Sequence, residues 1–256
     1  MAFSAKSEFN IPLGGVFKLK LEIENGVLKK LDMVYFGDFD IKDIVIPYGV
    51  TKIGFQAFQS NGYRIESITI PDTVTEIDDE AFSNCFLITS ITIPDSVISI
   101  GNHAFEECRK LENITIGKSV VSIGDRAFHC CRSLKSVTIG NSVTSIGDFA
   151  FSSDDKLESI TFGNSLTSIG SFAFNGCHSL KSITLPDSVT EVGESAFEFC
   201  SGLTSLTLGK GLKVFGDYAF GDCENLKTIT LPSRDFKLDP KAFDDVSNFV
   251  FNYKEN

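Results

Sequence analysis

The sequence has no stretch that approaches the roughly 18 apolar residues of a membrane-spanning helix. Basic residues are also scarce, because 23 Lys and Arg stand against 34 Asp and Glu, for a net charge of −11. Binding to a nucleic acid backbone or docking on an anionic membrane surface needs clustered Lys and Arg. We therefore expect no nucleic acid partner and no direct membrane insertion.

Histidine is rare as well, and the three His residues are scattered, with no metal-compatible partner at helical spacing. The one cluster of suitable side chains, His129-Cys130-Cys131, lacks the second pair of ligands that a zinc site needs. The sequence also lacks a Gly-rich phosphate loop, a nucleophile elbow and a pair of catalytic carboxylates. We predict no metal, no cofactor and no enzymatic activity.

The first ten residues, MAFSAKSEFN, lack the basic start and the apolar core of a secretory signal. This composition fits a cytoplasmic protein, and it equally fits a secreted or surface protein whose leader has been removed. The compartment therefore stays open. No linker rich in Pro, Ser or Gly interrupts the region described next, so we expect a single continuous unit there.

What the sequence does contain is a fixed period. Nine phenylalanines, each preceded by alanine, recur along the chain with a first interval of 24 residues and later intervals of 23. Such a period is typical of a solenoid, in which each coil buries its apolar face on the next. We predict that the nine rings stack along the centre. They belong to Phe58, Phe82, Phe105, Phe128, Phe151, Phe174, Phe197, Phe220 and Phe243.

Six of the seven cysteines lie three residues after the repeated phenylalanine, and Asp154 takes this position in one unit. A shared position indicates a shared role, that of a small, buried, weakly polar side chain at a turn. Neighbours in such a stack would lie about 5 Å apart, which does not exclude a disulfide. Side chains that point in parallel nevertheless favour free thiols, so we predict reduced cysteines.

A short strand precedes a turn in each unit. Ile183-Thr184-Leu185 alternates apolar and polar residues, as a half-buried strand does, and the other units carry equivalent triplets. Pro or Gly then ends the strand, and a second short apolar pair follows. The Ala-Phe pair is expected in a helical turn of the return segment. Equivalent strands of successive units should pair in parallel and in register.

The repeated pattern Leu-x-x-Ile-x-Leu-Pro-x-Ser-Val-x-x-Ile-Gly-x-x-Ala-Phe-x-x-Cys resembles the leucine-rich repeat, specifically its BspA-like subclass of 23-residue units. The resemblance implies a curved leucine-rich-repeat solenoid with a parallel β-sheet on the concave side. Short strands and helical turns would form the return side. It also implies adhesion or protein recognition at microbial cell surfaces. An intracellular protein-interaction scaffold or regulator is the alternative.

Residues 1–42 lie outside the period and contain a hairpin signal. Residues 17–23 alternate strictly between apolar and polar side chains, and Asn25-Gly26 follows them as a strong turn signal. We predict that 1–42 form an N-terminal tail and a β-hairpin cap, with residues 1–10 loose. The cap would cover one open edge of the solenoid.

The remaining residues, 43–256, are predicted to form the solenoid of nine repeats. The period decays at its far end, where Asp235, Asp239 and Pro240 disturb the last unit. Residues 249–253 read as a final strand that closes the stack.

The strands present two columns of small hydroxyl side chains in the pattern Ser-x-Thr, which are expected on the concave face. Because β-branched Thr suits an exposed strand position, the columns have a structural explanation. The functional explanation is a hydroxylated surface that meets a protein or glycan partner, with a mixed-charge column beside it for specificity. Trp, Tyr and Arg, the usual hot-spot residues, are absent from the two hydroxyl columns. The candidate binding residues are Thr92, Thr115, Thr138, Thr161, Thr184, Glu112, Lys135, Glu158 and Lys181.

Overall fold

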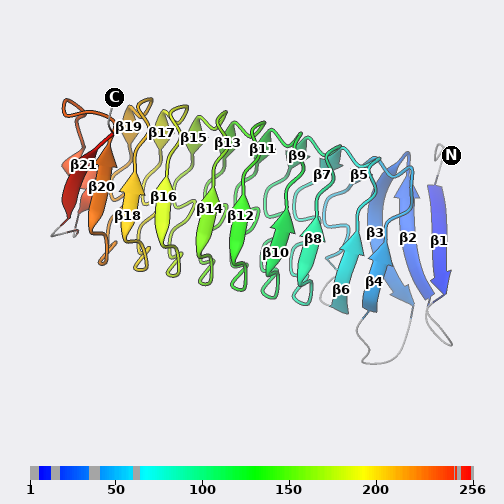
Figure 1. The fold of residues 1–256 in the computed structure, drawn as a ribbon. Coiled ribbons are helices and arrows are strands. Elements are labelled where there is room, and N and C mark those ends of the chain that lie inside the picture. Colours follow the sequence, from blue (N-terminus) through cyan, green and yellow to red (C-terminus); the bar gives the residue numbers. More distant parts are fainter. Residues whose placement is uncertain are drawn as a thin grey trace.

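The computed structural model describes residues 6–12, 18–34, 41–59, 64–244, 246 and 249–254. The chain winds into coils that stack along one axis, with two rows of short strands on different sides of the stack (Figure 1). Among the described residues, no helix is both long and apolar enough to cross a membrane.

The first row is an 11-stranded sheet, which we call the return sheet. It begins with three longer antiparallel strands, β1 (Lys6–Pro12), β2 (Lys18–Glu24) and β3 (Val27–Val34). The strands that follow β3 run parallel to it and to one another, and each contains only two residues. They are β5 (Lys52–Ile53), β7 (Glu76–Ile77), β9 (Ser99–Ile100), β11 (Ser122–Ile123), β13 (Ser145–Ile146), β15 (Ser168–Ile169), β17 (Glu191–Val192) and β19 (Val214–Phe215).

The second row carries the Ser-x-Thr columns, and we call its outer surface the hydroxyl face. It consists of a six-stranded and a four-stranded parallel sheet. The six-stranded sheet contains β4 (Ile41–Val45), β6 (Ile65–Thr69), β8 (Ser90–Thr92), β10 (Asn113–Thr115), β12 (Ser136–Thr138) and β14 (Ser159–Thr161). The four-stranded sheet contains β16 (Ser182–Thr184), β18 (Ser205–Thr207), β20 (Thr228–Leu231) and β21 (Val250–Tyr253).

These rows confirm the predicted solenoid of stacked parallel strands, and the N-terminal hairpin is also confirmed. Asn25 and Gly26 have φ angles of 50° and 79°, the left-handed pair that a two-residue hairpin turn requires. The expectation that residues 1–10 are loose is wrong for 6–10, because they lie in β1 and pair with β2. Residues 1–5 lie outside the described part of the chain.

The nine repeated phenylalanines form one continuous stack, as predicted. Their ring centroids are 4.8 to 5.3 Å apart and neighbouring ring planes differ by at most 23°. All nine rings are buried. The alanine before each ring lets two coils approach closely, since the Phe105 amide donates to the Ala127 carbonyl of the next coil at 2.7 Å. Apolar burial and backbone pairing therefore repeat together at every step.

The return segment forms consecutive tight turns, in place of the helical turn expected around the Ala-Phe pair. In the first eight repeats the residue before the alanine has a left-handed backbone, as at His103 (φ 55°) and Arg126 (φ 55°), whereas Lys241 before the ninth alanine lies in a 3-10 helix. A right-handed helix cannot pass through such a residue. Alternate backbone amides of this segment also donate their hydrogen bonds to the next coil. Arg126 N donates to Asp148 O at 2.8 Å and Phe128 N to Ala150 O at 2.7 Å. Hydrogen bonds between coils thus replace those of a helix.

The cysteine column has a specific role in the core. Its thiols are buried and free, and most of them donate to the phenylalanine carbonyl of the preceding coil, as Cys131 Sγ does to Phe105 O at 3.3 Å. Burial raises the pKa of four thiols of this column, Cys85, Cys131, Cys177 and Cys200, and raises the pKa of Cys223 to about 12. A buried thiol is a small side chain that can still satisfy a carbonyl, which explains the choice of cysteine.

Asp154 interrupts this column. Its side chain is fully buried, and neither carboxyl oxygen has a hydrogen-bond partner among the described residues. Burial raises the pKa of Asp154 well above its usual value. The coil that contains Asp154 therefore carries a buried carboxyl group, whose neutral form is favoured by burial, where its neighbours carry a thiol.

A 3-10 helix, η2 (Pro240–Phe243), begins the last coil. The Asp239 side chain caps it by accepting a hydrogen bond from Lys241 N at 3.0 Å. β21 then pairs in parallel with β20 and extends the hydroxyl face by one strand.

Candidate binding surface

The structure exposes all five predicted threonines on the hydroxyl face. Each lies at the end of a three-residue strand whose central apolar residue points into the core, so its side chain points outward. The pairing is in register, with Thr92 opposite Thr115 and Thr138 opposite Thr161. These four threonines belong to the six-stranded sheet, whereas Thr184 belongs to the four-stranded sheet.

In the six-stranded sheet, successive coils pair two by two along this face. Ile93 N donates to Thr115 O at 2.9 Å and Ile139 N to Thr161 O at 2.8 Å, and at these steps the strands pair over three residues. At the intervening steps, β6 with β8 and β10 with β12, the strands share a single residue pair. Between β14 and β16 no strand pairing is found among the described residues. From β4 to β16 the face is therefore a series of paired strands separated by looser steps, whereas β16, β18, β20 and β21 pair continuously.

The turns that follow the strands show the same alternation. A Cβ atom added to Gly117 would lie 2.2 Å from the carbonyl oxygen of Pro94, and one added to Gly163 would lie 2.3 Å from that of Gly140. A Cβ atom added to Gly140 would lie 4.0 Å from its nearest neighbour, the Gly117 carbonyl oxygen. Gly117 and Gly163 thus occupy tight steps where no side chain fits, whereas Gly140 occupies a wide one.

The four charged candidates form a column beside the hydroxyls, with alternating sign on successive coils. Lys135 Nζ lies 2.6 Å from Glu112 Oε2, and this hydrogen-bonded ion pair lowers the pKa of Glu112 and raises that of Lys135. Glu158 and Lys181 are exposed on the next two coils, and no ion pair of either is found in the described part of the chain. Glu158 and Lys181 are therefore free to meet a partner, whereas Lys135 already has one.

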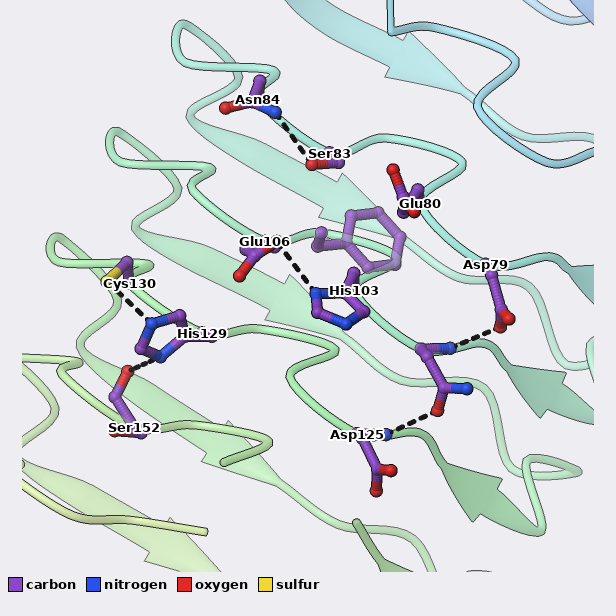
Figure 2. A network of polar contacts seen from close by, with 12 residues as sticks. Asp79, Glu80, Ser83, Asn84, His103, Glu106, Asp125, His129, Cys130 and Ser152 are labelled. Carbon is purple, nitrogen blue, oxygen red and sulfur yellow. Dashed lines mark hydrogen bonds and ion pairs between the residues drawn. The ribbon is translucent and has the colours of Figure 1, made fainter. Parts of the chain in front are cut away.

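The His129-Cys130-Cys131 cluster separates into two environments, and Figure 2 shows the one that holds His129 and Cys130. Cys131 belongs to the buried column, while Cys130 Sγ lies 3.4 Å from His129 Nε2. His129 Nδ1 lies 3.0 Å from the Ser152 carbonyl oxygen, which only accepts hydrogen bonds, so Nδ1 carries the proton. Burial lowers the pKa of His129 and raises that of Cys130, so both groups are neutral. No three potential ligands come together at a metal-binding distance among the residues that the structure describes.

A second polar feature in Figure 2 holds the coil edges together. Asn102 N donates to Asp79 Oδ1 at 2.7 Å, and Asp125 N donates to Asn102 Oδ1 at 2.8 Å. The pattern continues as Asp148 N donates to Asp125 Oδ1 at 2.8 Å and Ser171 N to Asp148 Oδ1 at 2.7 Å. We call this series the Asx ladder. Its carboxylates and amides accept backbone hydrogen bonds, so they serve the stack.

The sequence reasoning missed an aromatic cluster on the return side. Phe149 and Phe172 stack with ring centroids 4.7 Å apart, and the Arg126 guanidinium lies 4.4 Å from the Phe149 centroid. All three residues directly precede the repeated alanine and have a left-handed backbone, and all three side chains are half-buried. The signal was present in the sequence, because an arginine and two aromatics follow one another in a single column of the repeat.

Comparisons with known proteins agree with this geometry. The model of the BspA type leucine-rich repeat region matches residues 29–155 and 121–250, with six copies. A leucine-rich repeat protein from Bacteroides ovatus has a similar structure, with a TM-score of 0.60 and 25% identity over 91% of this chain and 71% of that one. The T. pallidum leucine-rich repeat protein is also similar, with a TM-score of 0.60 and 29% identity over 85% of this chain and 91% of the other. None of the curated proteins matches this chain.

Proposed function

The chain belongs to the BspA-type leucine-rich repeat family, and from this premise we propose that it is a non-catalytic binding module that recognises a protein or glycan through the hydroxyl face. The family consists generally of repeat proteins without catalytic activity. The observation that carries the proposal is the pair of exposed Ser and Thr columns, which continue from coil to coil on one side of the molecule.

The chemistry of this face suits a broad partner surface. Its side chains are short hydroxyls that both donate and accept hydrogen bonds and that lose little conformational entropy on binding. Aromatic anchors are absent from the two hydroxyl columns, so no single contact dominates. We expect weak contacts at many coils, with total affinity growing with the number of coils engaged.

Specificity is expected to come from the charged column. Glu158 and Lys181 lie on adjacent coils, joined by a backbone hydrogen bond of 3.2 Å from Lys181 N to Glu158 O. Their free charges of opposite sign would select a partner with the complementary arrangement. Lys135 contributes less, because Glu112 already neutralises it.

We further propose that the binding serves adhesion at a microbial cell surface. This step rests on the resemblance to BspA-like repeats. The acidic composition, with a net charge of −11, is consistent with a protein or glycan as the partner and not a nucleic acid.

The test begins with arrays of immobilised glycans and proteins, followed by affinity measurements on each hit. Lys135→Glu with Lys181→Glu should weaken a genuine partner by about tenfold, and Lys181→Glu alone should account for most of the loss. Thr138→Arg with Thr161→Arg should block binding by filling the face. The matched control is Lys213→Glu with Lys237→Glu, which makes the same change in net charge elsewhere. Unchanged affinity in both hydroxyl-face variants would show that the partner binds to another surface of the protein.

A further inference from the structure

The return sheet ends with an unpaired strand edge. β19 is the last arrow of its row in Figure 1, although the chain continues through another coil. The equivalent residues of that coil, 236–239, form no strand with β19. Pairing between the two coils resumes only later, where Tyr218 N donates to Lys241 O at 2.9 Å and Phe220 N to Ala242 O at 2.7 Å.

The missing hydrogen bonds can be identified from the preceding coil. There Thr190 O accepts from Lys213 N at 2.9 Å, and Val192 O accepts from Gly216 N at 2.7 Å. One coil further on, the equivalent acceptors are the carbonyl groups of Lys213 and Phe215. No described residue donates a hydrogen bond to either of them. Phe236 N donates instead to Ser233 O of its own turn, at 3.4 Å.

A groove lies where the missing pairing would be. It is a shallow groove of about 500 Å³, open to solvent, between Lys213 and β19 on one side and residues 237–240 of the last coil on the other. Phe215 and Leu238 are half-buried and give it an apolar base, and the Phe215 ring packs edge-on against Phe236 with centroids 6.5 Å apart.

The rim of the groove is positively charged. Lys213 occupies the position at which the three preceding coils have threonine. In the next coil the equivalent residue is Phe236, and Lys237 follows it directly. Both side chains are exposed, and the described residues contain no ion pair with either. The neighbouring Asp239 carboxylate caps η2 and adds one negative charge, so the two lysines leave the groove lining with a net charge of +1. A net positive groove is notable in a chain with a net charge of −11.

We propose that this groove binds an extended acidic peptide segment of a partner protein, which adds to the return sheet as a strand beside β19. An extended backbone supplies the N–H donors that the Lys213 and Phe215 carbonyls lack, and a helix cannot, because its own turns use those groups. Alternate side chains of such a strand point toward the base and toward solvent. Apolar ones would pack on Phe215 and Leu238, while acidic ones would meet Lys213 and Lys237.

The site is separate from the hydroxyl face, so the two proposals stand or fall independently. The groove contacts only the last strand of the return sheet, whereas the hydroxyl face belongs to the other row of strands. Either surface can be occupied with the other free.

The experiment uses a fluorescently labelled peptide of alternating glutamate and valine, with binding to the full chain followed by fluorescence anisotropy. Lys213→Glu with Lys237→Glu should weaken binding by about tenfold or more. The matched control is Lys135→Glu with Lys181→Glu, which leaves the groove intact and should leave the affinity unchanged. Both groove lysines are exposed, so these changes should not unfold the protein.

Two N-methylated analogues test the backbone contact. One carries methyl groups on the odd residues and the other on the even residues, so the charges are the same. Because successive residues of a strand direct their N–H groups to opposite edges, only one analogue should lose binding. Equal binding of both analogues would overturn strand addition and leave only charge attraction.

Two further outcomes would also overturn the proposal. One is the absence of measurable binding of the unmodified peptide at millimolar concentration. The other is self-association of the chain, measured by sedimentation, that Lys213→Glu with Lys237→Glu abolishes. That result would make a second copy of this protein the occupant of the groove.

Discussion

Asp154 shows how one side chain can define a weak point in a repetitive core. Neighbouring coils place a thiol at this position, and a thiol can be buried at little cost. A carboxyl group at the same position has lost its hydration, and neither of its oxygens has a hydrogen-bond partner within the described residues. An unsatisfied buried polar group costs about 1–3 kcal/mol.

We predict that Asp154→Cys raises the free energy of unfolding by about 1–3 kcal/mol at neutral pH. Urea denaturation under reducing conditions measures the change. The control is Asp155→Asn, which removes the adjacent, less buried carboxylate and should change stability by less than about 0.5 kcal/mol. Equal stability of wild type and Asp154→Cys would mean that the carboxyl group is satisfied in solution.

The same residue predicts a pH dependence. In the unfolded chain Asp154 ionises near its ordinary pKa of about 3.9, whereas in the folded chain burial keeps it protonated to higher pH. Between the two pKa values the unfolded chain holds fewer protons, so stability falls as pH rises above about 4. Denaturation midpoints measured from acid to neutral pH should show this decline in the wild type. The decline should be smaller in Asp154→Cys.

Two phenylalanines separated by one alanine offer a direct comparison of core and surface. Phe151 belongs to the central stack and is fully buried, whereas Phe149 lies half-buried beneath Arg126. We predict that Phe151→Ala lowers the free energy of unfolding by about 3–5 kcal/mol, because it removes a ring from the stack and leaves a cavity. Phe149→Ala should cost only about 1 kcal/mol, through lost stacking and cation–π contact. Chemical denaturation of both variants tests the ranking, and similar losses would contradict it.

At the scale of the element, the turns are held by side chains that act across coils. The Asx ladder connects one bend to the next through a side-chain oxygen and a backbone amide. Its acceptors are Asp79, Asn102, Asp125 and Asp148, and because Asn102 accepts in the same way as the three Asp residues, the position requires the acceptor oxygen and not the negative charge. A repeat of this kind therefore tolerates a change of charge more readily than a loss of the acceptor.

We predict that Asp125→Ala lowers the free energy of unfolding by about 1 kcal/mol, since it removes the acceptor for Asp148 N. Asp125→Asn keeps that acceptor, as Asn102 does one coil earlier, and should be nearly neutral. Thermal or urea denaturation distinguishes the two. A loss in Asp125→Asn as large as in Asp125→Ala would show that the charge matters.

The sequence predicted the elements that depend on apolar spacing. The alternation Ile-Thr-Ile gave the strands, the Ala-Phe period gave the ring stack, and Asn25-Gly26 gave the hairpin. The return turns were harder, because left-handed residues such as Arg126 and Phe149 are not glycine and carry no visible signal. The groove also could not be predicted from the sequence, because it depends on backbone hydrogen bonds that residues 236–239 of the last coil do not make with β19.

The candidate site was predictable only in part. Exposure of the threonine columns followed from strand alternation, but the pairing of coils two by two did not, since the same triplets stand at tight and loose steps. The ion pair between Glu112 and Lys135 required side-chain positions, and so did the finding that Lys181 has none among the residues described.

For the whole molecule, the unit of stability is the coil and not the individual strand. Each coil contacts mainly its two neighbours, so stability should be a sum of coil and interface contributions. A whole coil can then be deleted if the two coils that flanked it can stack directly on each other. This requires that the deletion remove one full period, so that equivalent residues still meet.

We predict that deletion of residues 144–166, one full period, leaves a folded solenoid in which Phe128 stacks on Phe174. Its circular dichroism should keep the β signal, and the denaturant dependence of unfolding should fall because less surface is buried. Deletion of residues 144–155, which breaks the period, should prevent cooperative unfolding. A folded, cooperative product from the shorter deletion would refute stacking in register as the source of stability.

The alternation of tight and loose steps on the hydroxyl face has a mechanical consequence. The ring stack and the return sheet run along the axis as a stiff spine, whereas the opposite wall has seams at every second coil over much of its length. A pulling or bending load would therefore be taken up at the seams before the spine yields. Such a molecule can lean toward a curved target and recover its shape when released.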